Sequence, residues 1–358
     1  MNAPVAIAAG GTGGHVYPAL AVAAELRSRT VPVVWLGTSA GLEARVVPAA
    51  GIELETLRVG GLRGKGWRTR VAAPVSLARA CWQAGAILRR QRPRALLGMG
   101  GFAAGPAGLM AALGRCPLVI HEQNAAPGLT NRLLARPAQR VLEAIPGTFP
   151  AARGAIATGN PVRAEIAALP PPEERFAARS GPVRLLVLGG SQGARWLNER
   201  LPQVLARLEP QQRPEVTHVG GPQQWQRARA AYDAAGVAAT VVPYIEDMAG
   251  ALAAADVAIA RAGAMTVAEL ASAGLGALLI PYPHAVDDHQ ARNAEWLARA
   301  GAARVVRESA LDDDRLEAEL RALLGTRAAL LERARCAHAV ARPDAARAVA
   351  DQILEVAR

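Results

Sequence analysis

The stretch that most constrains the fold lies at the start of the chain, where a short apolar run ends in a cluster of glycines. Residues 5–15 read VAIAAGGTGGH, and an apolar segment of helical period follows them. The pattern predicts a buried strand, a tight turn and the start of a helix. Glycine permits positive φ and close approach of a ligand, and a helix start offers N–H groups and a positive dipole end to an anion. His15, at the helix start, is therefore a candidate general base beside an anion-binding turn.

This turn matches neither of two common phosphate-binding patterns. No Gly-Lys-Ser/Thr follows, which excludes a Walker A loop. The dinucleotide fingerprint is incomplete, because Val16 stands where its third glycine or alanine belongs. One such turn alone is equally well explained as a plain strand–helix connection with a capping histidine.

Composition indicates a globular, basic protein of two domains. The chain has 358 residues, enough for two cores, and its 51% hydrophobic and 20% charged content exclude a disordered protein. The net charge of +11 indicates an acidic partner, namely nucleic acid, anionic lipid or a phosphorylated substrate. Compositional bias of an Ala- and Arg-rich proteome explains the charge equally well.

Cysteine usage and hydropathy predict a reducing cytoplasmic location. The 3 cysteines lack CxxC spacing and are too few for a disulfide framework. No basic segment precedes the first apolar run, so we expect no secretory signal. No uncharged run reaches the length of a membrane span, so we expect none.

Alternating strands and helices predict parallel sheets with crossover helices, hence an α/β protein. Strands are expected at 4–9, 32–36, 52–57, 94–98, 117–121 and 139–143, and then at 183–188, 215–219, 239–242, 256–260, 276–280 and 303–306. Helices are expected at 15–28, 41–50, 71–91, 105–113, 128–136, 311–324, 326–338 and 343–357. Ligands of such sheets bind at the carboxyl ends of the strands.

A basic loop and an amphipathic segment follow the third expected strand. Residues 59–70 are rich in glycine and basic side chains, and 71–92 is apolar on one side and basic at its ends. A basic amphipathic segment can rest on an anionic membrane. From the pattern alone, an ordinary crossover helix that packs on its sheet is the better interpretation.

A second glycine turn and a polar strand exit follow. Residues 98–108 read GMGGFAAGPAG, with Pro106 expected in the first turn of a helix. The segment fits the loose dinucleotide pattern, with Glu122 about 20 residues on as a candidate ribose-binding acid. The turn follows a late strand, however, which weakens that interpretation. Residues 121–124 (HEQN) end the next strand and are a candidate site, or else a helix entry capped by Asn124.

The second half repeats this organisation after a crossing at 158–163. A third glycine turn lies at 189–194 and opens a helix. Residues 264–266 would point helix-start N–H groups at a phosphate, and Glu269 would bind sugar hydroxyls or simply favour the helix dipole. Residues 284–289 hold two histidines and two aspartates, but four nearly contiguous groups have poor geometry for a metal. Gln290 and Asn293 suit hydrogen bonds to a neutral polar ligand instead.

Seven motifs in order resemble the MurG family of bacterial glycosyltransferases, which make lipid II. They are GGTGGH (10–15), GMGGF (98–102), HEQN (121–124), TGNPVR (158–163), GGSQGA (189–194), RAGAMT (261–266) with Glu269, and DDHQ (287–290) with Asn293. They span nearly the whole chain, and only Met265 varies, at a position that is often Leu in the family. The family transfers N-acetylglucosamine (GlcNAc) from UDP-GlcNAc to undecaprenyl-pyrophosphoryl-N-acetylmuramoyl-pentapeptide.

The resemblance implies a GT-B fold, with two Rossmann-like domains whose parallel sheets face a cleft. The N-terminal domain would span 1–160 and be joined by the helix at 343–358, and the donor domain would span 161–342. Ser191 and 264–266 would hold the diphosphate, Glu269 the ribose, Ile245 the uracil, Arg163 the nucleotide and Gln290 the GlcNAc hydroxyls. The remaining implied donor residues are Thr12, Gly13, Gly14, Asn124, Ala264, Met265, Thr266, Val267 and Ala268. The turns with Gly10, Gly11, Gly100 and Gly101 would hold the acceptor pyrophosphate.

The family's lipid-anchored acceptor also favours membrane docking. The implied patch consists of Val71, Val75, Arg79, Trp82 and Arg89, on an enzyme peripheral to the cytoplasmic face of the inner membrane. The implied partners are UDP-GlcNAc, the undecaprenyl-linked acceptor and anionic inner-leaflet lipid, with other cell-wall synthesis proteins as candidates. We expect no nucleic acid, no cofactor and no metal.

The resemblance also suggests a mechanism. The C4 hydroxyl of the muramoyl sugar would attack the anomeric carbon in one inverting displacement, with His15 as the base. Helix-start N–H groups would stabilise the departing diphosphate. The alternatives are another UDP-sugar transferase with a lipid acceptor, a dinucleotide-dependent oxidoreductase and a basic nucleic-acid-binding protein. The second lacks its fingerprint in the first βα unit, and the third leaves the glycine turns unexplained.

Overall fold

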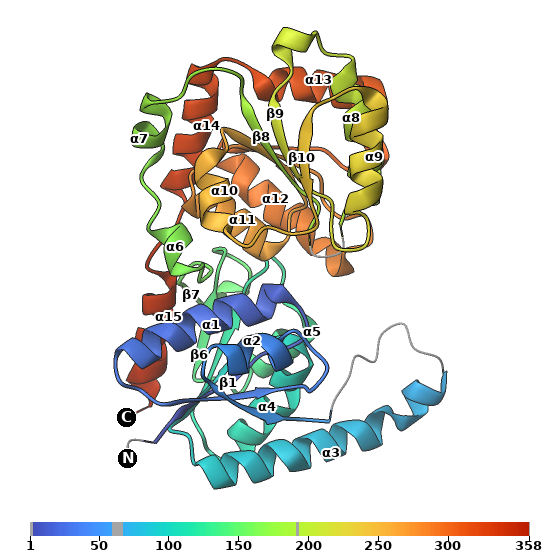
Figure 1. The fold of residues 1–358 in the computed structure, drawn as a ribbon. Helices are drawn as coiled ribbons and strands as arrows, with labels where there is room; N and C mark the ends of the chain where they lie inside the picture. Colours follow the sequence, from blue (N-terminus) through green and yellow to red (C-terminus); the bar gives the residue numbers. More distant parts are fainter. Residues whose placement is uncertain (1–2, 59–66, 191–192, 358) are drawn as a thin grey trace. The chain divides into compact units, whose positions relative to one another are not determined.

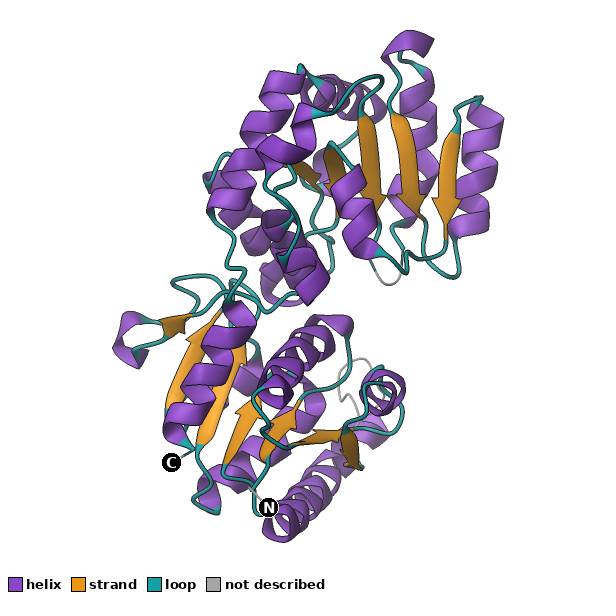
Figure 2. Cartoon of the chain, turned by 60° about the vertical axis from the view of Figure 1, so that its left-hand side comes forward, coloured by secondary structure: helices purple, strands orange, loops and turns teal. Residues whose placement is uncertain are grey.

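The computed structural model describes residues 3–58, 67–190 and 193–357, which form two compact units (Figure 1). The N-terminal unit comprises Met1–Arg163 together with Asp344–Arg358, and the C-terminal unit comprises Ala164–Pro343. Each unit is built on its own parallel sheet covered by helices on both faces (Figure 2). The predicted α/β class with two Rossmann-like domains is confirmed.

The N-terminal sheet has the strand order β3-β2-β1-β4-β5-β6-β7. Its strands are β1 (Val5–Ala8), β2 (Val33–Gly37), β3 (Glu53–Thr56), β4 (Ala95–Gly98), β5 (Leu118–Glu122), β6 (Arg140–Glu143) and β7 (Ile156–Ala157). All six strands predicted in this half are present. The two-residue β7 was not predicted, because so short an edge strand has no periodic pattern to detect.

Helices close both faces of this sheet. They are α1 (Gly13–Ser28), α2 (Glu43–Ala49), α3 (Trp67–Gln91), α4 (Gly101–Leu113), α5 (Leu129–Leu134) and α15 (Ala345–Val356), with a 3-10 turn at Ala151–Arg153. One apolar cluster joins the sheet to α1, α2 and α15, and the other joins it to α3, α4 and α5. Apolar side chains of α15 pack against those of α1, and Arg29 pairs with Asp351 at 2.5 Å between Nη1 and Oδ1.

Two helices begin four residues before their predicted starts, α3 at Trp67 and α4 at Gly101. In α4, Pro106 therefore lies in the helix interior and is buried. Pro18 occupies the same sixth position in α1. A proline inside a helix removes one backbone hydrogen bond, and the apolar faces of both helices are nevertheless held by packing on the sheet.

The C-terminal sheet has the strand order β10-β9-β8-β11-β12-β13. Its strands are β8 (Arg184–Leu188), β9 (Glu215–Val219), β10 (Ala239–Val242), β11 (Val257–Ala260), β12 (Ala277–Leu279) and β13 (Ala303–Val305), which are the six that the sequence predicted. The helices are α6 (Ala164–Ala167), α7 (Pro172–Ala177), α8 (Arg195–Ala206), α9 (Trp225–Ala235), α10 (Met248–Ala254), α11 (Ala264–Ser272), α12 (His289–Arg299), α13 (Asp313–Leu324) and α14 (Arg327–Ala339). Short 3-10 turns lie at Pro210–Gln212, Val286–Asp288 and Glu308–Ala310.

In both sheets the strand order reverses beside the first strand of the unit. The reversal lies between β1 and β4 in one sheet and between β8 and β11 in the other. Ligands of open parallel sheets bind at the carboxyl ends of the strands at such a reversal. All the glycine turns found in the sequence follow one of these four strands, so each unit has a candidate site at its own reversal. Among the described helices, none combines the length and the apolar character needed to cross a bilayer.

Candidate functional site

The two glycine turns of the N-terminal unit pack against each other through their backbones. A Cβ added at Gly101 would lie 2.1 Å from the carbonyl oxygen of Gly10. Gly100 and Gly101 both have positive φ, at +92° and +79°, as does Gly11 at +97°. Only glycine satisfies both the close approach and the backbone conformation. The predicted acceptor-pyrophosphate turns are thus one structure in this unit, formed at the ends of β1 and β4.

His15 lies against this double turn. It is the third residue of α1, and its Nδ1 is 2.9 Å from Oε1 of Gln123. A Cβ added at Gly100 would lie 2.9 Å from both Cε1 and Nδ1 of the imidazole, so the glycine leaves room for the ring. Thr12 is the exposed N-cap residue of α1, and its side chain makes no capping hydrogen bond. The helix start predicted from Thr12, Gly13 and Gly14 is therefore present, with no acidic side chain in its first turn.

A buried carboxylate that the sequence reasoning missed supports the first turn. Glu43, at the start of α2, is fully buried. Its Oε2 accepts from the backbone N–H of Gly11 at 3.0 Å. Its Oε1 accepts from the backbone N–H of Thr38 at 3.0 Å and from the Thr38 hydroxyl at 2.6 Å. An acid in the first turn of a helix suggests only a dipole interaction, so the sequence held no sign of this role.

The conformation of the HEQN segment is fixed by hydrogen bonds to one of its own side chains. Glu122 is buried and accepts from the backbone N–H and Nδ2 of Asn124, both at 3.1 Å. It also accepts from Gly128 N at 3.0 Å and Asn131 Nδ2 at 2.9 Å. The carboxylate therefore shapes the loop that presents Asn124, which argues against its role as a ribose-binding acid. The alternative interpretation, in which Asn124 caps a helix, was wrong, because α5 begins at Leu129 with Gly128 as its N-cap.

The C-terminal unit repeats the interlocked turn. A Cβ at Gly193, which has φ +75°, would lie 2.5 Å from the carbonyl oxygen of Gly220. Ser191, the predicted diphosphate ligand, lies outside the described residues. Helix α11 begins at Ala264 after Gly263 as N-cap, and its first turn carries no acidic residue. The other predicted residues of this helix lie on its first two turns, with Val267 buried and Met265, Thr266, Ala268 and Glu269 partly exposed.

Arg261 ties together the loops around that helix start. Its guanidinium is buried, pairs with Glu308 and donates from Nη1 to the carbonyl oxygens of Ile280 and Pro281, each at 3.2 Å. Asn293 Nδ2 donates to the carbonyl oxygen of Ala262 at 3.1 Å. These four polar contacts hold the exits of β11 and β12 in place. The RAGAMT motif predicted a phosphate site, but it did not predict the contacts that its arginine makes with these loops.

The predicted sugar-binding loop carries its own contacts. Oε1 of Gln290 accepts from the backbone N–H of Tyr282 at 2.9 Å. Asp288 pairs with Arg307 at 2.6 Å, which lowers the pKa of its carboxyl below the usual range. That pairing is a further argument against a metal at 284–289, and no group of three metal-binding side chains occurs in the described part of the chain.

Two predicted nucleotide contacts remain. Ile245 is partly buried in the loop between β10 and α10, where it packs on the apolar cluster of the C-terminal unit. Arg163 ends the N-terminal unit, with its guanidinium carbon 5.8 Å from the centre of the Tyr17 ring of α1. Neither geometry by itself indicates a nucleotide.

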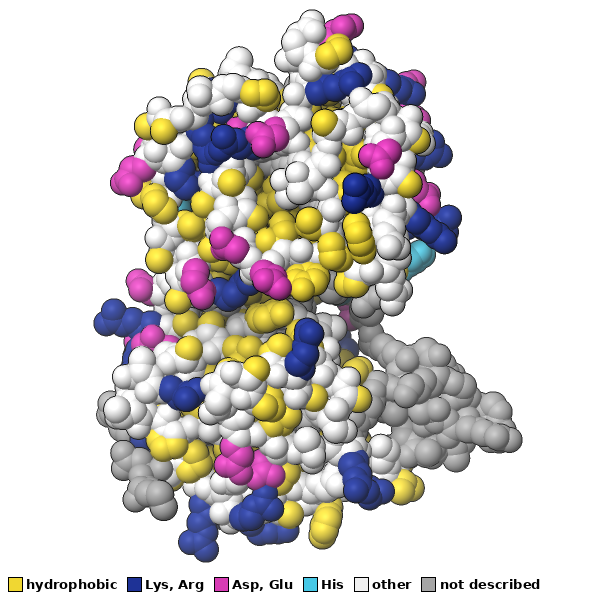
Figure 3. All heavy atoms as spheres, in the orientation of Figure 1, with side chains coloured by type: hydrophobic (Ala, Val, Ile, Leu, Met, Phe, Trp, Pro, Cys, Tyr) yellow, Lys and Arg dark blue, Asp and Glu magenta, His cyan; other side chains and the backbone are white. Residues whose placement is uncertain are grey.

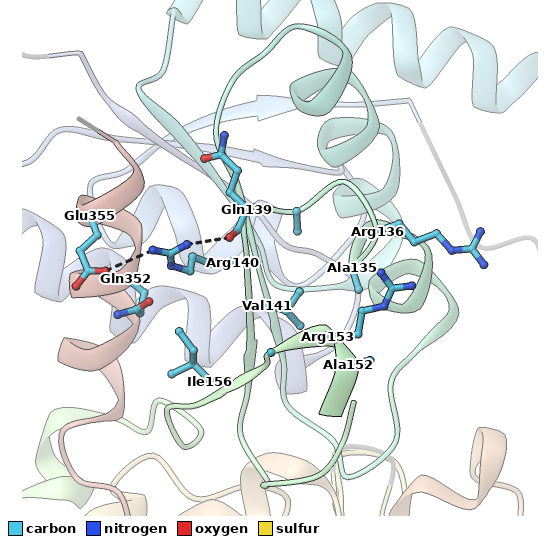
Figure 4. A pocket seen from close by; sticks show the side chains of 12 residues that line it. Ala135, Arg136, Gln139, Arg140, Val141, Ala152, Arg153, Ile156, Gln352 and Glu355 are labelled. Carbon is cyan, nitrogen blue, oxygen red and sulfur yellow. Dashed lines mark hydrogen bonds and ion pairs between the residues drawn. The ribbon is translucent and has the colours of Figure 1, made fainter. Parts of the chain in front are cut away.

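A shallow polar pocket of about 510 Å³ opens elsewhere in the N-terminal unit (Figure 4). It is lined by β6, the 3-10 turn at Ala151–Arg153 and α15. Arg140 lies between the carbonyl oxygen of Gln139 and the Glu355 carboxylate, at 3.2 and 4.0 Å. None of the predicted site residues lines it, so it is separate from the glycine turns.

An apolar surface lies on the outer side of α3, α4 and α5. Val75 and Trp82 of α3 are 73% and 69% exposed, and Arg79 and Arg89 are exposed beside them. Other exposed apolar side chains of these helices are Leu77, Phe102, Leu109, Leu113, Leu129 and Leu133. Basic and hydrophobic side chains lie side by side along the lower edge of this unit (Figure 3). We call these residues the α3–α5 surface; the Val71 side chain lies outside the described part.

Comparisons with known proteins point to one family. Residues 5–143 match the glycosyltransferase family 28 N-terminal domain, and residues 184–349 match the family 28 C-terminal domain. A protein of Alkalilimnicola ehrlichii is 57% identical over 358 residues, which is 100% of both chains. A protein of Halorhodospira halophila is 56% identical over 99% of this chain and 98% of its own. Both are named UDP-N-acetylglucosamine–N-acetylmuramyl-(pentapeptide) pyrophosphoryl-undecaprenol N-acetylglucosamine transferase.

Solved structures agree with this. The crystal structure of Acinetobacter baumannii MurG superposes with a TM-score of 0.84 at 39% identity, covering 99% of this chain and 100% of that one. The kitacinnamycin glycosyltransferase superposes with a TM-score of 0.73 at 17% identity over the whole of both chains, which supports the fold alone.

Proposed function

This chain belongs to glycosyltransferase family 28, and we propose that it divides the transfer of GlcNAc between its two units. It is an N-acetylglucosamine transferase of the kind named for its full-length relatives. The donor is UDP-GlcNAc, and the acceptor is the muramyl-pentapeptide on pyrophosphoryl-undecaprenol. The observation that carries the proposal is the glycine turn beside the strand reversal in each unit, with His15 against one of them.

The C-terminal unit binds the donor. Helix α11 begins at Ala264, has the positive end of its dipole there and carries no acidic side chain in its first turn, which suits a diphosphate. Charge grows on that diphosphate as the bond to the sugar breaks, so the helix start stabilises the transition state more than the ground state. Glu269 binds the ribose, Ile245 the uracil and Gln290 the GlcNAc hydroxyls, while Arg163 contacts the nucleotide.

The N-terminal unit binds the acceptor and supplies the base. The double turn formed by Gly10, Gly11, Gly100 and Gly101 holds the acceptor pyrophosphate. His15 takes the proton from the C4 hydroxyl as its oxygen bonds to the anomeric carbon and the bond from that carbon to the UDP oxygen breaks. One displacement inverts the anomeric configuration and releases UDP. No metal or cofactor is required by this scheme, since imidazole and helix-start N–H groups carry each step.

The direct test is transfer of labelled GlcNAc to a lipid-linked muramoyl-pentapeptide, with UDP-glucose and UDP-GalNAc as competing donors. We expect transfer from UDP-GlcNAc alone. His15→Ala should lower turnover by about 10²- to 10⁴-fold, the range of general-base catalysis, while calorimetry finds UDP binding unchanged. Full turnover of His15→Ala would exclude it as the base, and equal use of UDP-GalNAc would indicate another sugar transferase.

The enzyme works at a membrane surface, because its acceptor is anchored in lipid. The α3–α5 surface supports this part of the proposal, since it exposes Trp82 and Val75 among arginines. Each basic residue near an anionic leaflet contributes about 1 kcal/mol of attraction. We therefore place the enzyme peripherally on the cytoplasmic face of the inner membrane, in peptidoglycan synthesis.

A further inference from the structure

A chain of three hydrogen bonds connects His15 to a backbone carbonyl deep in the N-terminal unit. It begins at Gly159, whose carbonyl oxygen is 2.9 Å from Nε2 of His121. Nε2 of Gln123 is 3.1 Å from Nδ1 of His121, and Oε1 of Gln123 is 2.9 Å from Nδ1 of His15. His121 is completely buried and Gln123 is 1% exposed, so water does not compete for the two bonds of His121, whereas His15 is partly exposed.

The chain has a direction, set by the carbonyl at its buried end. A carbonyl oxygen can only accept, so Nε2 of His121 carries the proton. Burial lowers the pKa of His121 to about 4, which keeps the ring neutral and leaves Nδ1 with a free electron pair. The Gln123 amide must then present its NH₂ to Nδ1 of His121. The same NH₂ is 3.1 Å from the His121 carbonyl oxygen, a second acceptor that disfavours the flipped amide.

The oriented amide determines the state of His15. With NH₂ turned toward His121, Gln123 presents its oxygen to Nδ1 of His15, and that nitrogen must donate. A neutral imidazole with its proton on Nδ1 has its basic electron pair on Nε2. Gly100 supports this arrangement, because any side chain there would press on Cε1 and Nδ1 of the ring.

We propose that His121 and Gln123 are positioning residues that hold the proton of His15 on Nδ1, so that Nε2 receives the proton of the acceptor hydroxyl. The catalytic half of this inference rests on the proposed role of His15 as base. The tautomer itself does not, because it follows from the hydrogen bonds alone. Neither His121 nor Gln123 touches the reacting atoms; both act through His15.

The tautomer can be measured without any turnover. The full chain labelled with ¹⁵N-histidine gives a long-range ¹H–¹⁵N spectrum in which the two neutral tautomers have different patterns, and the His15→Gln variant identifies the signals of His15. At about pH 8, where free imidazole is neutral, we expect His15 protonated on Nδ1. In Gln123→Met, a side chain of similar length without hydrogen bonds, the proton should redistribute to Nε2. Protonation on Nε2 in the unchanged chain would overturn the inference, as would an unchanged pattern in Gln123→Met.

Kinetics then separate positioning from simple support of the fold. Gln123→Met should lower kcat by about 10- to 100-fold, as loss of a partner that orients a functional histidine does, with the KM for UDP-GlcNAc within about twofold. Gln123→Glu keeps an oxygen acceptor for Nδ1 of His15, and as a protonated carboxyl it can still donate to Nδ1 of His121, so it should retain the tautomer and a larger share of kcat than Gln123→Met. Equal losses of kcat in the two variants would indicate a merely structural role and would contradict the proposal.

Two controls complete the design. Gln139→Met makes the same substitution at an exposed glutamine of this unit and should change neither spectrum nor kcat. Gln123→Met combined with His121→Phe should be no slower than Gln123→Met alone, because both residues act through one bond to His15. Additive losses in kcat would mean that His121 acts by another route. The spectrum reports on the relay, whereas the turnover of His15→Ala reports on the base, so the two proposals fail separately.

Discussion

Glu43 is the single side chain on which the geometry of the first glycine turn most depends. Its two carboxylate oxygens accept from one donor of the turn and two donors of Thr38. Gly10 and Gly41 pack so closely on this carboxylate that a Cβ at either would lie 2.5 and 2.1 Å from its oxygens. The first glycine turn is thus supported from behind by a buried carboxyl group.

Replacing this carboxylate by an amide should weaken the N-terminal unit. In Glu43→Gln the NH₂ of the new amide faces either the N–H of Gly11 or the two donors of Thr38. At least one buried donor therefore loses its acceptor. The expected loss is about 1 to 3 kcal/mol in the free energy of unfolding, measured by hydrogen exchange of β1 and β2 peptides. Glu53→Gln, at an exposed acid of β3, should change it little. Equal protection of β1 in Glu43→Gln and the unchanged chain would refute the role given to Glu43.

The second glycine turn of the N-terminal unit fits against the first only because Gly101 has no side chain, since the Gly10 carbonyl lies where its Cβ would be. Gly101→Ala should therefore be costly for two separable reasons, a positive φ and a clash with the Gly10 carbonyl. Gly147→Ala isolates the first reason, because Gly147 has φ +85° with no atom within 4 Å of its Cβ position. We expect the free energy of unfolding to fall by about 1 to 2 kcal/mol in Gly147→Ala and by about 2 to 5 kcal/mol in Gly101→Ala. Equilibrium hydrogen exchange measures both losses. Similar losses in both variants would show that the close approach contributes nothing.

Helix α3 carries the charge and the apolar side chains of the proposed membrane contact. The double variant Arg79→Glu/Arg89→Glu should reduce binding to anionic vesicles by about thirtyfold or more, from about 1 kcal/mol per basic residue. Sedimentation with phosphatidylglycerol vesicles measures this. Arg227→Glu/Arg229→Glu on α9 makes the same change of charge at exposed sites in the other unit and is the matched control. An equal loss in both would mean that net charge, and no particular surface, governs binding.

Across the whole molecule, the repeated pattern of strand, glycine turn and helix made the fold predictable. Twelve strand positions and the two-sheet class followed from periodicity, because apolar runs ending in glycine are a local signal. What escaped prediction depends on contacts between distant residues. The partners of Glu43 and of Gln123 lie up to 32 and 108 positions away. The interlock of Gly10 with Gly101 likewise appears only once β1 and β4 are neighbours. The sequence thus predicted the strands after which the glycine turns lie, but not the buried polar groups that hold those turns.

Both units contain a buried neutral histidine, which gives the whole molecule a common response to acid. Burial lowers the pKa of His121 in the N-terminal unit and of His218 in the C-terminal unit from 6.5 to about 4. Between these values the unfolded chain binds protons that the folded units do not. The contribution of these histidines to the free energy of unfolding is therefore complete above about pH 6.5 and falls as the pH drops toward 4, by up to about 3 kcal/mol for each histidine.

Hydrogen exchange from pH 7 to 4.5 should find both sheets losing protection. His218→Gln should flatten this decline in the C-terminal sheet alone, whereas His284→Gln, at an exposed histidine of the same unit, should leave it unchanged. A decline that is the same in all three proteins would assign the acid sensitivity to carboxylates, not to the buried imidazoles.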